Sequence, residues 1–283
     1  MQLMTPDSLV MLNSCLDHAT EDTLFISGGT DMILKFREEG FGTSQVIDLS
    51  GLSELKYITE TENEVCIGAL TTLSTLVYSD VLKAHAPMLS CAADQVGSTQ
   101  IRNAATIGGN VANSFAGADL IPPLFALNAQ VDTLGKKGVK RSIPVRDFVT
   151  GNRKNMLEAG EVICQVRFEK KRGAQFFGKI GSRSRVTISK LNMASFVQVE
   201  NGKIMSAEVA FGALGASAFL SEGAQTCLVG QSVNEIDFDK LSAALIQQVD
   251  DAIPTRKSRI YKRDAVVSLA DGLLKSVRSE CEV

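Results

Sequence analysis

The spacing of apolar residues predicts short helices and short strands along the first two thirds of the chain. Leu9, Leu12 and Leu16 recur at helical spacing, which predicts an amphipathic helix over residues 6–19. Short apolar runs bounded by turn-forming residues are typical of strands. Such runs lie at residues 24–26, 46–49, 56–58, 65–69, 131–134 and 160–168, and helices are expected from residue 71 onward and at residues 88–96, 118–124 and 144–148.

The last third of the chain predicts a hairpin followed by two helices. The dipeptide Asn201-Gly202 separates two alternating runs, residues 196–200 and 204–211, which is the strongest hairpin signal in the sequence. Apolar residues at helical spacing follow, from Phe238 to Val249 and from Tyr261 to Val277. This mixture of short elements predicts an α+β fold, with a first domain boundary near residue 56.

Two glycine pairs are unusual because each follows apolar residues and precedes hydrogen-bonding side chains. The first is in residues 27–31 (SGGTD), between a predicted strand and a predicted helix, and the second is in residues 106–110 (TIGGN). We interpret the surrounding stretch, residues 98–113, as a polar turn region, since Asn, Ser and Thr disfavour helix interiors. Glycines at positive φ expose amides that suit a phosphate. The sequence therefore predicts a phosphate-containing ligand, and tight turns without a ligand are the alternative.

Composition excludes several other classes of protein. The 283 residues carry a net charge of −3 without a large basic cluster, which does not favour nucleic-acid binding. The sequence has neither the pattern of a signal peptide nor an apolar run long enough for a membrane span, so we expect a cytoplasmic protein. Six cysteines without a C-x-x-C pair and only two histidines predict buried structural thiols and no metal site.

The two glycine motifs, in this order, resemble the flavin-pyrophosphate signatures of the FAD-binding medium subunits of molybdenum hydroxylases. That family includes bacterial xanthine dehydrogenases, nicotinate dehydrogenase and carbon monoxide dehydrogenase. The resemblance covers essentially the full chain. Further matching motifs are IGALTT (67–72), QIRN (100–103), DLIPP (119–123), GEVI (160–163), FGK (177–179) and YKR (261–263).

The resemblance implies a three-part fold that holds FAD. We expect this FAD to be non-covalently bound, because neither glycine turn contains a histidine or a cysteine. Two α/β FAD-binding subdomains of the PCMH type would span residues 1–55 and 56–170, and a C-terminal domain with a small antiparallel sheet and helices would span 171–283. Asp119 would bind ribityl or nearby hydroxyls, while Ile163 and Lys179 would lie against the isoalloxazine ring. The remaining cofactor-binding residues by this resemblance are Ile26, Ser27, Gly28, Gly29, Thr30, Asp31, Met32 and Ile33, and Asn103, Thr106, Ile107, Gly108, Gly109 and Asn110.

Lys179 is the residue to which we assign a catalytic role. A cation beside the flavin would stabilise the negative charge that reduction adds to the ring. Taken without the resemblance, a lysine on the exposed face of a strand is an equal alternative. We also expect valine at Gly29 or Gly108 to abolish flavin retention and to leave a soluble fold, because both positions need the freedom of glycine.

The implied function is electron transfer within a complex. The chain would pass electrons from the iron–sulfur clusters of a small subunit to NAD or another acceptor, while a molybdopterin large subunit hydroxylates the substrate. The acidic residue that follows this lysine in animal xanthine dehydrogenases is not evident in residues 182–186, which leaves the acceptor open. The cysteine-bearing insertion of hydroxybenzoyl-CoA reductases is absent, so no cluster is expected here. A stand-alone flavin-dependent reductase of the same fold and a non-enzymatic nucleotide-binding module are the alternatives.

Overall fold

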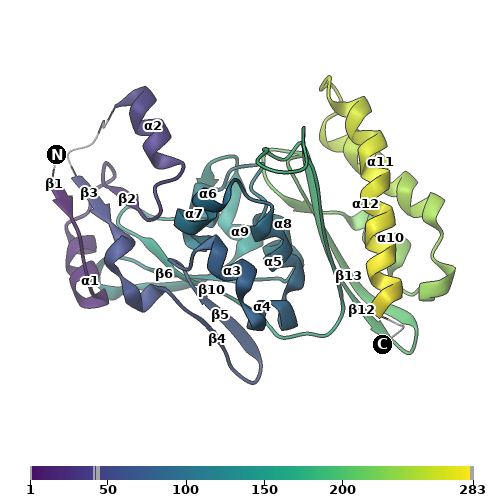
Figure 1. The fold of residues 1–283 in the computed structure, drawn as a ribbon, viewed down its shortest axis with the longest axis horizontal. Helices are drawn as coiled ribbons and strands as arrows, with labels where there is room; N and C mark the ends of the chain where they lie inside the picture. The colour runs from purple at the N-terminus through teal and green to yellow at the C-terminus, as the bar shows by residue number, and fades with distance from the viewer. Residues whose placement is uncertain (1, 41, 43–44, 281–283) are drawn as a thin grey trace.

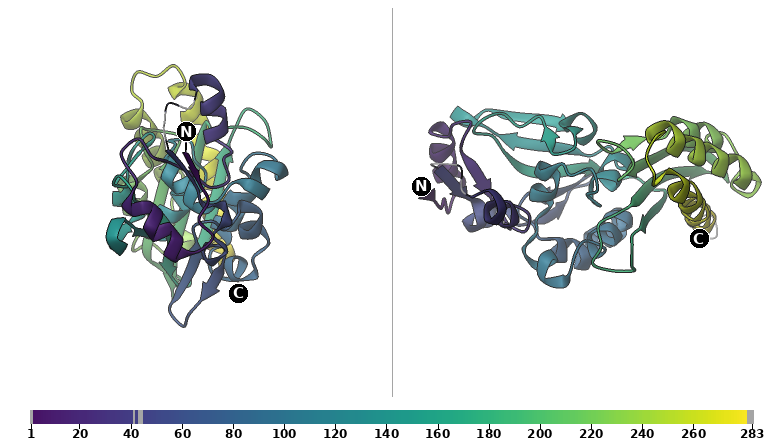
Figure 2. Two further views of the ribbon diagram at one scale, coloured as in Figure 1. Left: turned by 90° about the vertical axis from the view of Figure 1, so that its left-hand side faces the viewer. Right: turned by 90° about the horizontal axis from the view of Figure 1, so that it is seen from above.

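The computed structural model describes residues 2–40, 42 and 45–280 and has an elongated shape (Figure 1). The N-terminal elements lie at one end and the C-terminal helices at the other, with the middle segment between them. The view from above shows the same order along the long axis, and the other turned view looks down that axis from the N-terminal end (Figure 2). Among the described residues, no helix is long and apolar enough to cross a membrane.

A three-stranded parallel sheet forms the N-terminal part. Its strands lie in the order β1 (Gln2–Met4), β3 (Gln45–Asp48) and β2 (Leu24–Ile26), with α1 (Leu9–Asp17) between β1 and β2 in sequence and α2 (Met32–Glu39) after β2. Ligands of open parallel sheets bind beyond the carboxyl ends of the strands, where the glycine turn after β2 lies. Two short 3-10 helices complete this part, η1 (Leu49–Gly51) and η2 (Ser53–Leu55).

A five-stranded antiparallel sheet forms the centre of the middle part. Its order is β4 (Ile58–Glu60), β5 (Glu64–Gly68), β10 (Val162–Glu169), β6 (Gln130–Leu134) and β7 (Lys140–Pro144). Short helices pack on this sheet and share one large apolar core with it. The other elements are α3 (Leu73–Tyr78), α4 (Asp80–His85), α5 (Pro87–Asp94), α6 (Thr99–Ala104), α7 (Ile107–Asn113), α8 (Ile121–Ala126), η3 (Lys136–Gly138), α9 (Val145–Phe148), β8 (Val149–Gly151) and β9 (Lys154–Asn155).

The C-terminal part is a four-stranded antiparallel sheet with helices beside it (Figure 1). Asn201 and Gly202 have φ values of 51° and 74°, the left-handed pair that a two-residue hairpin turn requires. The strands are β11 (Ala174–Ile180), β12 (Leu191–Glu200), β13 (Lys203–Gly212) and β14 (Phe219–Leu220), and the helices are α10 (Glu222–Leu228), η4 (Val233–Glu235), α11 (Phe238–Ala252) and α12 (Arg259–Glu280).

The predicted α+β architecture and most of the predicted elements are confirmed. The interpretation of residues 98–113 as a polar turn region is wrong, because this stretch contains α6 and α7. Ser98 and Thr106 begin these helices, and their side chains accept hydrogen bonds from the amides of Ile101 and Gly109. Such caps satisfy amides that would otherwise be orphaned, which offsets the low helix propensity of the sequence.

The cysteines differ from expectation. Of the described cysteines, Cys15 is buried, Cys66, Cys164 and Cys227 are partly exposed, and Cys91 is exposed, so the expectation of mostly buried thiols is wrong. Cys281 lies outside the described residues. Within the described part of the chain, no group of three or more His, Cys, Asp or Glu side chains could hold a metal ion.

Three apolar cores accompany the three predicted domains, whose exact boundaries stay a prediction. The N-terminal core also takes in Leu134 and Val162 from the middle part. The core of the middle part takes in Phe177 and Phe196 from the C-terminal sheet. A third core lies under α10, α11 and α12. Neighbouring parts therefore share apolar contacts.

Candidate functional site

The first glycine turn connects the end of β2 to the start of α2 and presents unpaired amides. Gly29 has a φ of 66°, and its carbonyl oxygen accepts a hydrogen bond from the amide of Ile33 at 3.0 Å. In the described part of the chain, nothing accepts a hydrogen bond from the amides of Gly28, Gly29 or Thr30. Free amides before a helix attract anions, so this turn has the geometry of a phosphate site.

The second glycine pair occupies the first turn of α7, and its amides have partners within the protein. The amide of Gly109 donates to the side-chain oxygen of Thr106 at 3.1 Å. The amide of Gly108 donates to the carbonyl oxygen of Ala69 at 2.8 Å. Neither Gly108 nor Gly109 has a positive φ, and in the first turn Gly28 does not either. The expectation of left-handed glycines is therefore wrong at these three positions, and free amides are not found at residues 108 and 109.

The two glycine motifs lie against each other, although 79 positions separate the residues that join them. The hydroxyl oxygens of Ser27 and Thr106 are 3.1 Å apart. At the far end of α7, the side-chain amide of Asn113 donates to the Asp31 carboxylate. A Cβ at Gly28 would overlap the backbone at the end of α6, so this close approach requires glycine. We call this meeting place the turn junction.

Two residues of α7 shape the turn junction: Gly109 leaves space there, and Asn110 presents a free hydrogen-bond acceptor. A Cβ at Gly109 would lie 2.9 Å from both Ser27 Oγ and Thr106 Oγ1, so a side chain there would fill the space beside these hydroxyls. Asn110 Oδ1 is buried and has no hydrogen-bond partner among the described residues. Because buried acceptors are nearly always satisfied, the position suits a hydroxyl donor from a ligand.

A buried polar network lies where the middle part meets the C-terminal sheet. Lys179 Nζ, on β11, donates to Asp119 Oδ2 at 2.6 Å and to the Gln95 carbonyl oxygen at 2.9 Å. Asp119 Oδ1 accepts from Ser189 Oγ at 2.5 Å and from Asn192 Nδ2 at 2.7 Å. The side chains of Lys179 and Asp119 are only 5% and 6% exposed, which is inconsistent with a solvent-exposed lysine.

Comparison with known proteins assigns these regions to one family. Residues 1–168 match the family model described as the FAD binding domain in molybdopterin dehydrogenase, and residues 177–277 match that of the CO dehydrogenase flavoprotein C-terminal domain. The chain belongs to the family of FAD-binding subunits of molybdopterin dehydrogenases. It is therefore an oxidoreductase flavoprotein subunit, and the resemblance found in the sequence is confirmed.

Relatives that match over most of the chain support membership of this family. The nicotinate dehydrogenase FAD-subunit of Eubacterium barkeri is 30% identical over 263 residues, which cover 91% of this chain and 88% of the relative. The putative xanthine dehydrogenase FAD-binding subunit XdhB of Escherichia coli K12 is 27% identical over 259 residues, covering 90% and 87%. A chain of carbon monoxide dehydrogenase from Hydrogenophaga pseudoflava shares the fold, with a TM-score of 0.89, 22% identity and coverage of 99% and 98%.

Among the described residues, the remaining predicted ones contribute no side-chain hydrogen bond to the turn junction. Asn103 is exposed on α6, and its Oδ1 accepts from Ser74 Oγ at 2.5 Å. Ile107 and Ile163 are buried in the core of the middle part. Their assignment to FAD stays a prediction. Beside the first glycine turn lie the half-buried Ile26 and Met32 and the exposed Ile33.

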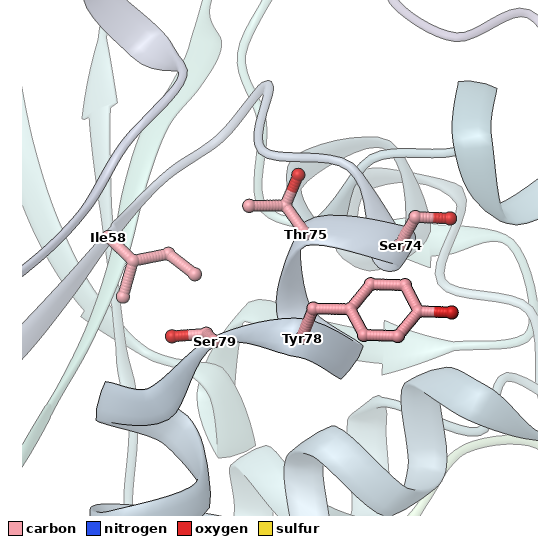
Figure 3. A pocket seen from close by; sticks show the side chains of 5 residues that line it. All are labelled: Ile58, Ser74, Thr75, Tyr78 and Ser79. Atoms are coloured by element: carbon pink, nitrogen blue, oxygen red, sulfur yellow. The ribbon is translucent and has the colours of Figure 1, made fainter.

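A groove beside α3 is a separate feature of the surface (Figure 3). Figure 3 shows side chains of α3 at this groove, with Ser79 just beyond the end of the helix and Ile58 opposite, on β4. Apart from these two, the lining residues are Ser74, Thr75 and Tyr78. None of them belongs to the turn junction or to the Asp119 network, so the candidate site remains with those two features.

The sequence did not predict Gln95, Ser189 or Asn192 as members of the Asp119 network. Ser189 and Asn192 lie 70 and 73 positions from Asp119, and no local pattern connects them to it. The one sequence feature that could have indicated this network is Asn192, because a polar amide is unusual among the apolar residues that begin β12. Its Oδ1 is buried without a partner among the described residues.

We expect the Gly108→Val variant to destabilise the fold. The sequence-based expectation that this variant keeps an intact fold is therefore corrected. A Cβ at Gly108 would lie 2.6 Å from Ala69 Cβ and 2.8 Å from the Ala69 carbonyl oxygen. Because this backbone cannot move aside easily, we expect the free energy of unfolding to fall by about 3 kcal/mol. Urea unfolding of the flavin-free chain measures the loss, and a midpoint equal to that of the wild type would contradict it.

Proposed function

We propose that the chain binds FAD across the turn junction and the Asp119–Lys179 network, and that it transfers electrons from partner subunits to an acceptor. The contact between Ser27 and Thr106 is the observation that carries this proposal. It brings together the two motifs that the family resemblance assigns to one pyrophosphate. Family membership supports FAD as the ligand of this region.

The groups at the turn junction fit the pyrophosphate and the sugar hydroxyls of FAD. The free amides of Gly28, Gly29 and Thr30 would donate to phosphate oxygens. The missing side chain at Gly109 leaves room beside two hydroxyl groups. Asn110 Oδ1, a buried acceptor, would take a hydrogen bond from a ligand hydroxyl. The turn junction thus offers hydrogen-bond donors for the phosphate oxygens and an acceptor for a ligand hydroxyl.

The Asp119–Lys179 network would hold the flavin end of the ligand. Bound FAD supplies the ability to accept and release electrons one or two at a time. Lys179 contributes positive charge in a site from which water is largely excluded, and such charge favours the reduced, more negative ring. Asp119 holds the lysine ammonium in place through Oδ2, and this oxygen has a further lone pair for a ribityl hydroxyl, whereas Oδ1 already accepts from Ser189 and Asn192.

We infer that iron–sulfur clusters on a small subunit reduce the flavin, and that a molybdopterin large subunit oxidises the substrate. The relatives support a complex of several subunits, since they are FAD-subunits of nicotinate and xanthine dehydrogenases, and the matched family model is that of a molybdopterin dehydrogenase. NAD or another acceptor would then take the electrons. The Asp119–Lys179 network is the part of this chain that sets how readily the flavin gives them up.

Native purification of the tagged chain from its source tests the proposal. We expect two further subunits to co-elute and the complex to contain FAD, iron and molybdenum. A chain that purifies alone, carries FAD and is bleached by NADH would instead be a stand-alone reductase. A chain that purifies without flavin and takes up none would be a non-enzymatic module.

We expect FAD to leave the chain when the protein is denatured. A covalent flavin link in proteins commonly needs a histidine or cysteine side chain, and neither glycine turn contains one. Acid or heat precipitation should therefore release all of the flavin into the supernatant, where its fluorescence is measured. Flavin that remains in the washed pellet would contradict this prediction.

A further inference from the structure

The β8–β9 hairpin holds the end of α7 beside the first glycine turn. At the hairpin tip, Asn152 Oδ1 accepts a hydrogen bond from the amide of Ala116 at 3.0 Å. The amide of Arg153 donates to the carbonyl oxygen of Ser114, the left-handed residue that ends α7, at 2.8 Å. These two bonds fix the backbone of the tip against the segment that leaves α7.

The side chain of Arg153 connects this hairpin to the first glycine turn through one amide. Arg153 Nη1 donates to Asn113 Oδ1 at 2.9 Å, and Asn113 Nδ2 in turn donates to the carboxylate of Asp31. The guanidinium carbon lies 5.4 Å from the centroid of the Phe115 ring, within the range of a cation–π contact. Asn113 and Phe115 therefore position the guanidinium on the side of the turn junction.

The charge of Arg153 is not neutralised by the described part of the protein. No described carboxylate lies within ion-pair distance of its guanidinium, and Asn113 is a neutral partner. The charged side chain within the first glycine turn itself is Asp31, which would repel a phosphate. An anion at this turn therefore needs a nearby cation, and Arg153 has unused N–H donors in the fork geometry that suits phosphate.

The backbone at residue 153 is left-handed, so a glycine can replace the arginine without changing the shape of the hairpin. Arg153 has a φ of 58°, a left-handed conformation in which glycine is favoured and most other residues are strained. We propose that Arg153 binds a phosphate group of FAD as a charged extension of the first glycine turn. This inference rests on the proposed function, because it assigns one more residue to the same ligand.

The test is a titration of the flavin-free full-length chain with FAD, at low and at high salt. Arg153→Gly removes the guanidinium and suits the left-handed backbone, so the hairpin should keep its shape. Lys154→Ala is the matched control, because it removes the same charge from the neighbouring residue, whose side chain has no hydrogen bond in the described structure. Arg153→Lys keeps the charge without the fork.

We expect Arg153→Gly to weaken FAD binding roughly tenfold at low salt, with a smaller difference at high salt, where phosphate contacts are screened. Arg153→Lys should fall between this variant and the wild type, and Lys154→Ala should match the wild type. Thermal unfolding without FAD should show no loss of stability in Arg153→Gly. Equal affinities of Arg153→Gly and wild type would overturn the inference alone, whereas a wild type that takes up no FAD would overturn the proposed function with it.

Discussion

The Gly29→Val variant is expected to fold but to lose FAD almost completely. Gly29 has a φ of 66°, which a β-branched residue adopts only with strain, so the turn would change shape and move its free amides. A Cβ there meets Ile33 Cγ1 at 3.2 Å, and this exposed, flexible side chain can move aside, so the fold survives. We expect affinity for FAD to fall by at least about 100-fold, or ~2.7 kcal/mol.

Gly40→Val is the matched control for this experiment. Gly40 lies at the other end of the same helix, α2, with a φ of 77°, and a Cβ there would meet nothing within 4 Å. Both variants therefore place a valine in left-handed backbone, but only Gly29→Val disturbs the turn with the free amides. Calorimetric titration with FAD compares them. If Gly29→Val bound FAD as tightly as Gly40→Val, the first turn would be structural only.

Substitutions in the Asp119–Lys179 pair are expected to shift the flavin midpoint potential in opposite directions. Lys179→Met leaves the buried Asp119 carboxylate without a cation, so we expect a loss of about 3–5 kcal/mol in stability. The uncompensated negative charge should also lower the potential by about 30–60 mV, which is ~1.4–2.8 kcal/mol for a two-electron couple. Asp119→Asn leaves the lysine charge uncompensated, so the potential should rise by a similar amount.

Redox titration of both variants, with FAD affinity measured alongside, tests this pair. Lys190→Met is the control, since Lys190 is an exposed lysine that lies 5.2 Å from the Tyr261 ring and belongs to no part of the network. Its potential should equal that of the wild type. A change in affinity without a change in potential would mean that Lys179 contacts the phosphates. Unchanged potentials in Lys179→Met and Asp119→Asn would mean that the pair only joins the middle part to the C-terminal sheet.

Local sequence was sufficient for most elements and for the position of the two glycine motifs. The hairpin at Asn201-Gly202 and the capped helices follow from residues close together in the chain. Residues 98–113 are the exception. Two capped helices of six and seven residues form there although the composition favours turns, so the helix propensities of the residues alone did not predict them. The capping residues Ser98 and Thr106 are the local signal for these two helices.

Long-range partners could not be predicted, because no local pattern encodes them. The sequence pointed to Lys179 and Asp119 separately, but their ion pair joins residues 60 positions apart on different parts of the fold. The same holds for Gly108, which is glycine because Ala69 packs against it rather than because it needs a positive φ. Arg153 was missed for this reason as well, since its contacts with Asn113 and Phe115 arise only when the hairpin packs on α7.

A crystal structure of the chain with FAD would show directly which groups hold the ligand. We expect the pyrophosphate to lie on the amides of Gly28, Gly29 and Thr30, with a ligand hydroxyl on Asn110 and the ring beside Lys179. Density for FAD in the groove beside α3, or elsewhere away from the turn junction, would contradict this expectation.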